Sequence, residues 1–112
     1  MAYDRELAER IRGLLAEEAG VSEQAMFGGL AFLVGRNMAV AASGQGGLLV
    51  RVDPAESDAL QAETGATPME MRGREMAGWL RVESPAVRTE AQLNLWVRRG
   101  VRFARSLPAK SR

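Results

Sequence analysis

The spacing of apolar residues switches between a helical and a strand period along this 112-residue chain, and this switching constrains the fold most. Near the N-terminus, Leu7, Ile11 and Leu14 recur at intervals of three or four residues, which is typical of an amphipathic helix. We expect that helix over residues 4–19, with Gly20 as its stop. A chain of this length is expected to fold as one domain.

Beyond this helix the apolar period becomes two. Residues 30–34 and 38–42 alternate apolar and small side chains around a turn at 35–37, which predicts a β-hairpin. Residues 48–52 alternate in the same way after the glycine-rich loop 43–47. These segments predict a three-stranded antiparallel meander.

Capping signals predict two further helices. Asp53, followed by proline, is a typical N-cap and opens a short helix that ends near residue 64. Thr89 and Gln92 have the spacing of a capping box, which predicts a last helix over residues 90–106.

Between these two helices, residues 69–71 and 76–82 alternate around Gly73 and predict a second hairpin. The expected order is therefore α-β-β-β-α-β-β-α, an α+β fold with a mainly antiparallel five-stranded sheet covered by helices on one side. We assign residues 1–107 to this single domain and residues 108–112 to a flexible C-terminal tail.

Composition excludes much catalytic chemistry. The chain has neither histidine nor cysteine, which removes His-based general base catalysis, thiolate chemistry and the commonest transition-metal ligands. Gly44-Gln45-Gly46 opens like a dinucleotide-binding fingerprint, but Leu49 occupies the position of the third glycine and a strand follows. We therefore expect no enzyme activity, no metal and no cofactor.

The N-terminal sequence predicts the cellular location. Met1 is followed almost at once by Asp4, Arg5 and Glu6, so we expect no signal peptide, and no 18-residue apolar run predicts a membrane span. The absence of cysteine fits a reducing compartment. These features favour a cytoplasmic protein that does not contact membranes.

Glycines and apolar residues gather in two strings that form our candidate interaction surface. Glycine within a strand either solves a geometric problem, such as a bulge, or lets a ligand or another backbone approach closely. Methionine is flexible enough to serve an irregular core or an adaptable binding surface. The candidate residues are Met26, Phe27, Gly28, Gly29, Gly73, Arg74, Met76, Gly78 and Trp79.

Basic residues are concentrated at the C-terminal end. From residue 91 onward there are six basic and no acidic residues, although the whole chain has a net charge of only +1. Arg98, Arg99, Arg102 and Arg105 are possible nucleic-acid contacts, or they form the solvated face of an amphipathic helix whose dipole favours cations near its end. A small-ligand or catalytic site around Arg51, Arg74 and Glu75 is a third interpretation.

Several of these strings resemble the N-terminal domain of the TfoX/Sxy family over nearly the whole chain. The strings are Met26-Phe27-Gly28-Gly29-Leu30-Ala31-Phe32, Met38-Ala39, Leu48 to Val52, Gly73-Arg74-Glu75-Met76-Ala77-Gly78-Trp79, Trp96-Val97 and Phe103-Ala104. The resemblance implies a fold similar to type III secretion chaperones, frequent homodimers, and bacterial proteins linked to natural competence. Larger regulators of this family have a second domain, which this sequence does not contain.

These observations lead to one principal hypothesis and one alternative. The principal hypothesis is a non-enzymatic protein-interaction or regulatory module, a homodimer with a further, unknown protein partner. The alternative is a nucleic-acid-associated regulator that uses the basic C-terminal helix.

Overall fold

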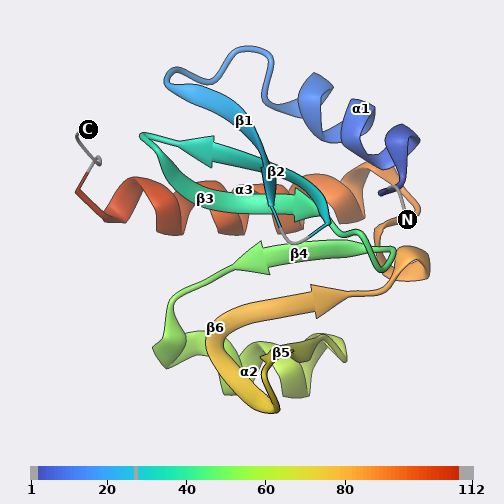
Figure 1. The fold of residues 1–112 in the computed structure, drawn as a ribbon, viewed down its shortest axis with the longest axis vertical. Coiled ribbons are helices and arrows are strands. Elements are labelled where there is room, and N and C mark those ends of the chain that lie inside the picture. The colour runs from blue at the N-terminus through green and yellow to red at the C-terminus, as the bar shows by residue number, and fades with distance from the viewer. Residues whose placement is uncertain (1–2, 27, 109–112) are drawn as a thin grey trace.

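The computed structural model describes residues 3–26 and 28–108, and its elements follow one another in α+β order (Figure 1). Three α-helices, six strands and one 3₁₀ helix are formed by these residues. Their bounds are α1 Arg5–Leu14, β1 Val21–Met26, β2 Gly29–Val34, β3 Asn37–Ala42, β4 Leu48–Arg51, α2 Pro54–Thr64, β5 Thr67–Met71, β6 Arg74–Val82, η1 Ser84–Val87 and α3 Glu90–Ser106.

The strands form one antiparallel sheet in the order β1-β2-β3-β4-β6-β5. The expected antiparallel α+β class is confirmed, but the sheet has six strands and the predicted number of five was wrong. The missed strand is β1, which lies between the predicted first helix and the first predicted hairpin. Its residues 22–25 are all exposed, so the segment lacks the apolar alternation by which a half-buried strand is recognised.

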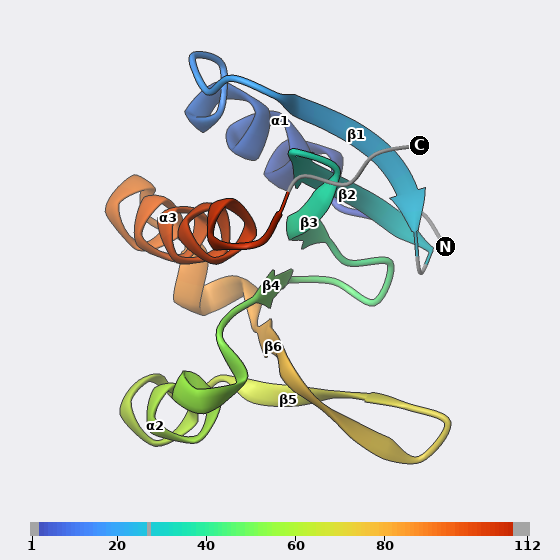
Figure 2. The same cartoon turned by 90° about the vertical axis from the view of Figure 1, so that its left-hand side faces the viewer.

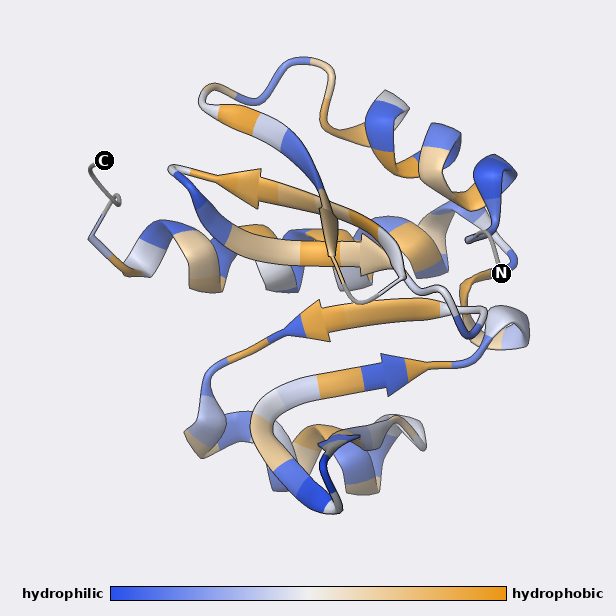
Figure 3. Ribbon diagram, viewed as in Figure 1, coloured by the Kyte–Doolittle hydropathy of each residue, from blue (hydrophilic) through white to orange (hydrophobic). Residues whose placement is uncertain are grey.

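All three helices lie on the same side of the sheet, as expected (Figure 2). The main core fills the space between them and the inward side chains of the strands. Phe32, Val40, Val50 and Leu80 are fully buried there. In Figure 3 the central strands are coloured as hydrophobic over most of their length, whereas the helices alternate between hydrophobic and hydrophilic residues. The residues of the helices that contact this core are Leu7, Ala8, Ile11, Leu60, Leu93, Trp96, Val97, Val101 and Ala104, and Leu15, the C-cap of α1, contacts it as well.

The capping predictions for the last two helices are confirmed. Thr89 accepts a hydrogen bond from the backbone N–H of Gln92, and the Gln92 side chain accepts one from the backbone N–H of Thr89, which completes the capping box of α3. Asp53 caps α2 by accepting from the backbone N–H of Ala55, and Gly65 ends this helix in the left-handed conformation with φ 80°.

The first helix is shorter than expected. It begins after Asp4, whose carboxylate accepts a hydrogen bond from the Leu7 N–H, and it ends at Leu14 rather than near residue 19. Gly20, with φ 75°, does not stop the helix. Its carbonyl accepts a hydrogen bond from the Gly35 N–H, so it belongs to the entry into β1.

Two tight turns connect the predicted hairpins. Gly35 and Arg36 both have positive φ between β2 and β3, and Arg72 and Gly73 both have positive φ between β5 and β6. Two successive residues of this kind match the right-handed twist of the flanking strands.

No helix within residues 3–26 and 28–108 is long and apolar enough to cross a membrane.

Candidate interaction surface

The face of the sheet opposite the helices is concave and apolar. Seen along the sheet in Figure 2, β1 and the β5–β6 hairpin both project away from the helices and form the two sides of the concavity. A second apolar cluster covers its floor, in which Ala31, Met38, Ala41 and Leu49 are buried. The sheet therefore separates two apolar clusters.

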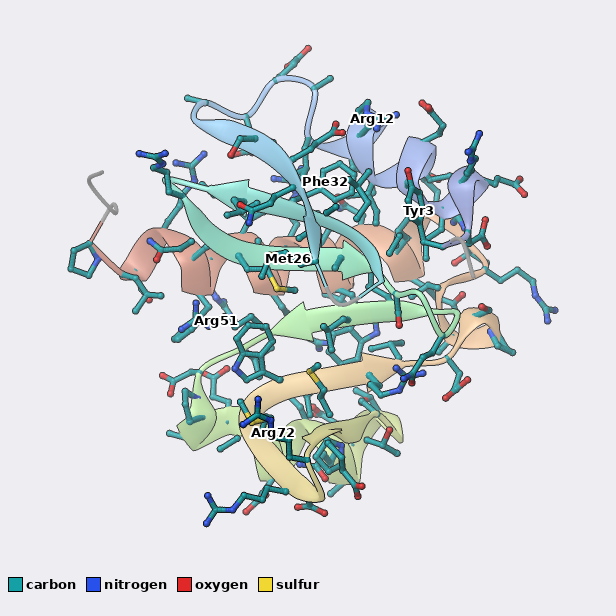
Figure 4. The ribbon with its side chains drawn as sticks, in the orientation of Figure 1. Tyr3, Arg12, Met26, Phe32, Arg51 and Arg72 are labelled. Carbon is teal, nitrogen blue, oxygen red and sulfur yellow. The ribbon has the colours of Figure 1, made fainter. Side chains whose placement is uncertain are left out.

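A groove of about 390 Å³ runs over this concave face between β1 and β5. We call it the concave groove; Met26 and Met69 line its two sides, and Ala41 and Leu49 lie on its floor. In Figure 4, Met26 lies over β3 and β4. Both methionines are half-buried, so their flexible thioethers are placed to adapt to an occupant.

One cation lies in the concave groove. Arg81 of β6 is half-buried, and its Nη1 is 3.4 Å from the Ser43 hydroxyl oxygen. This distance is long for a hydrogen bond. Within residues 3–26 and 28–108, Arg81 forms no ion pair, so its charge is available to an acidic group on an occupant.

Arg51 is the last residue of β4 and lies beyond the last β3–β4 pair, Val40 with Val50. Its guanidinium carbon lies 5.1 Å from the centre of the Trp79 ring on β6 and 5.4 Å from the centre of the Phe103 ring on α3. Figure 4 places Arg51 where β3 and β4 diverge. Arg51 is thus held by two cation–π contacts, which connect the concave face to the last helix.

The glycines of the candidate surface allow close packing of backbones. A Cβ atom at Gly29 would touch the Ala42 carbonyl oxygen, and one at Gly44 would touch the carbonyl oxygen of Gly28. A Cβ at Gly78 would lie 2.8 Å from the Val52 carbonyl oxygen, and the Gly78 carbonyl accepts a hydrogen bond from the Val52 N–H. The structure therefore favours the geometric interpretation of Gly28, Gly29 and Gly78.

The structure brings only part of the predicted surface together. Met26 and Trp79 both pack on the second apolar cluster. Gly73 and Arg74 lie at the exposed tip of the β5–β6 hairpin, and Met76 is half-buried in β6. Phe27 lies outside the described residues. The structure does not bring together the three residues of the small-ligand interpretation, because Arg74 and Glu75 lie near the hairpin tip, whereas Arg51 pairs with Trp79, four residues beyond Glu75 on β6.

Sequence reasoning missed Leu49, Met69 and Arg81 as parts of this surface. Alternation along a strand places each of them on the face opposite its direct neighbours. It could not show that β5 is the edge strand and β6 pairs with β4, because no short turn connects those two strands.

Two of the four predicted nucleic-acid contacts are engaged within the fold. Glu18 accepts hydrogen bonds from Arg105 and from Arg98, the latter at 2.7 Å. These bonds, with that from Arg105 contributing most, lower the pKa of Glu18 below its ordinary value. Arg98 also donates to the Leu14 carbonyl, so it connects α3 to the end of α1.

The other two arginines differ in exposure. Arg99 lies over the Trp96 ring at 4.5 Å, and its Nη1 atom is buried without a hydrogen-bond partner among the described residues. Arg102 is exposed. The four side chains therefore do not form one free basic face, and nucleic-acid binding stays a prediction that this arrangement does not favour.

Comparison with known proteins identifies the family. No curated protein matches the chain. The family model of the TfoX N-terminal domain matches residues 13–104, which include every strand, α2 and most of α3. Among the described residues there is no group of three acidic side chains placed to hold a metal ion. Since the match spans most of the 112 residues, the chain belongs to the TfoX N-terminal domain family.

Proposed function

We propose that this chain is a non-enzymatic interaction module that binds a partner protein through the concave groove. The observation that carries the proposal is the groove itself, which has two flexible methionines at its sides and an apolar floor. Surfaces of this kind accept apolar side chains of varied shape, because thioethers repack at low cost. A binding role also fits a chain without histidine or cysteine.

The chemistry of the groove specifies the kind of partner segment. Its floor presents the apolar residues Ala41 and Leu49, and its rim carries the half-buried cation Arg81 together with Glu70 and the polar residues Ser43 and Gln45. An extended peptide segment with an apolar residue next to an aspartate or glutamate satisfies both requirements. The apolar residue would displace water from Leu49 and Ala41, and the carboxylate would pair with Arg81.

Family membership supports a regulatory context for this interaction. The TfoX family is linked to the control of natural competence in bacteria, so we propose that the bound partner belongs to such a regulatory system and that binding takes place in the cytoplasm. Regulation of transcription would then act through the partner and not through direct contacts of α3 with DNA.

The experiment is a selection of displayed random peptides on the immobilised protein. Peptides that combine an apolar and an acidic residue should bind the wild type and lose at least tenfold in affinity on Met69→Glu, which places a charge in the groove. Glu63→Lys, an exposed change on α2 outside the groove, is the matched control and should bind normally. Selected peptides that bind Met69→Glu as well as the wild type would refute the proposal.

A further inference from the structure

The two edges of the sheet differ in how they are protected. Edge strand β5 contains Pro68, and its pairing with β6 is irregular between Pro68 and Met69. Proline and irregular pairing both hinder the addition of a further strand. Edge strand β1, the outermost strand at the top of Figure 2, has six residues without proline, pairs with β2 in unbroken register, and exposes residues 22–25. Within the part of the sheet that the structure describes, β1 is therefore the open edge.

The register defines which backbone groups of β1 face away from the sheet. The Gly35 N–H donates to the Gly20 carbonyl at 3.1 Å, so these two residues form a hydrogen-bonded pair directly before β1. Such pairs alternate with non-bonded pairs along an antiparallel ladder. The N–H and C=O groups of Val21, Glu23 and Ala25 therefore point outward, where an added strand would pair with them.

The middle of this edge carries a net negative charge. Arg12 of α1 donates to both carboxylate oxygens of Glu23, at 2.6 Å from Nε and 2.9 Å from Nη2, and it also pairs with Glu9. Two carboxylates and one guanidinium leave a net charge of −1. Glu9 and Glu23 are both exposed, so this cluster is open to one further cation.

We propose that the β1 edge binds an extended segment of another protein, which adds as a further antiparallel strand and places a lysine or arginine opposite Glu23. Side chains directly opposite each other in an antiparallel pair lie on the same face of the sheet. Glu23 points toward α1, where Arg12 holds it. The cation of the segment therefore lies on the helix side as well, and it neutralises the cluster.

The neighbouring positions define the rest of the segment. Residues two places before and after the cation lie opposite Val21 and Ala25, on the same face as Glu23. Val21 packs against the main core, so an apolar residue opposite it would extend that core. The pattern of the segment is thus apolar and basic residues at alternate positions.

A second copy of β1 does not have this pattern. Its sequence, Val-Ser-Glu-Gln-Ala-Met, contains no basic residue. Pairing two β1 edges would set one negative cluster against another, and like charges directly opposite are destabilising. The chemistry of the edge therefore favours a basic partner over a second copy.

The β1 edge is separate from the concave groove, because residues 21–25 do not line the groove. Binding at the edge does not depend on the function proposed for the groove. Met69→Glu should leave edge binding unchanged, so failure at one surface is distinguishable from failure at the other.

Charge selectivity is tested with two labelled seven-residue peptides in fluorescence anisotropy. One has a central lysine with valine two positions away on each side and threonine elsewhere, and the other has a central glutamate. The wild type should bind the lysine peptide about fivefold more tightly. Glu23→Gln should reduce this preference at least twofold, whereas Glu63→Gln, which removes an exposed carboxylate on α2, should not. Equal affinity of the wild type for both peptides would overturn the proposal.

Backbone pairing is tested with Ala25→Pro, with Ala25→Thr as the matched control. Proline removes an outward N–H but no bond to β2, so the circular dichroism spectrum should be unchanged while affinity for the lysine peptide falls at least tenfold. A folded Ala25→Pro that binds like the wild type would contradict strand addition. So would sedimentation that shows a dimeric wild type and a monomeric Ala25→Pro, because a second copy would then occupy the edge.

Amide hydrogen exchange on the wild type keeps the proposal testable if Ala25→Pro does not fold. The N–H groups of Val21, Glu23 and Ala25 should become protected when the lysine peptide binds. Those of Ser22 and Gln24, which pair with β2, should already be protected without it. Peptide binding that leaves the three outward amides unprotected would refute the proposed pairing.

Discussion

Two glycines inside helices, Gly13 in α1 and Gly100 in α3, have different surroundings. A Cβ atom at Gly13 would have no heavy atom within 4 Å. A Cβ at Gly100 would touch the carbonyl oxygen of Ala39 and lie 2.8 Å from Cγ1 of Val40, both on β3. Because the obstacle at Gly100 is the backbone of a central strand, it cannot move aside as a side chain would. The change to alanine should therefore have opposite effects at the two positions.

The expected magnitudes follow from these contacts. Alanine is favoured over glycine inside a helix by about 0.5–1 kcal/mol, and Gly13→Ala should gain that amount in free energy of unfolding. At Gly100 the same gain is outweighed by overpacking against β3, which costs about 1–3 kcal/mol or more. We expect Gly100→Ala to be less stable than the wild type by roughly 1–2 kcal/mol, and hence less stable than Gly13→Ala by about 2 kcal/mol.

Urea unfolding followed by circular dichroism measures both variants at one protein concentration, which keeps any contribution of self-association constant. The m value should be the same for all three proteins, so that a change in midpoint reports a change in stability. If Gly100→Ala were as stable as Gly13→Ala, α3 could not lie as close to β3 at Gly100 as the structure places it.

Three further predictions concern the surface and the caps. Thr89→Ala removes the N-cap of α3 and should lower the free energy of unfolding by about 1 kcal/mol in the same urea assay, whereas Thr89→Ser should be near neutral. Arg72→Asn should raise it by about 0.5 kcal/mol, since Arg72 has φ 55° and asparagine tolerates that conformation better; a loss of stability would contradict the assigned turn. Glu18→Gln should lower the melting temperature at neutral pH. The pKa of Glu18 is lowered in the folded state, so its carboxylate stabilises the fold above the ordinary carboxyl pKa. This stabilisation is lost as the pH falls through the lowered pKa. The difference from wild type should shrink as the pH falls through the lowered pKa, and a difference that stays constant as the pH falls would show that charge is not its cause.

The elements that could be predicted from the sequence are those with a local chemical signal. The capping box at Thr89 and the Asp53 cap followed by Pro54 define helix starts within a few residues, and both were confirmed. The end of α1 could not be predicted in this way, because residues 15–19 continue a helix-compatible composition up to Gly20. Strand β1 was missed because its stability comes from pairing with β2, a tertiary effect that leaves no apolar alternation in residues 22–25.

The candidate site was less predictable than the fold. Met26 and Trp79 were identified because they stand beside glycines, and both lie on the concave face. Leu49, Met69 and Arg81 come from three strands whose order depends on the long connection through α2. The pairing of Glu18 with Arg98 and Arg105 spans about 80 residues of sequence, so no local pattern could show that one carboxylate already engages two of these arginines.

The central claim of this account is that the concave groove is the surface by which the chain acts, and methionine methyl NMR tests it directly. With a selected peptide bound, the methyl resonances of Met26 and Met69 should shift and show contacts to the peptide, whereas that of Met76, which lies outside the groove, should not. Binding that leaves both groove methionines unchanged would contradict the claim.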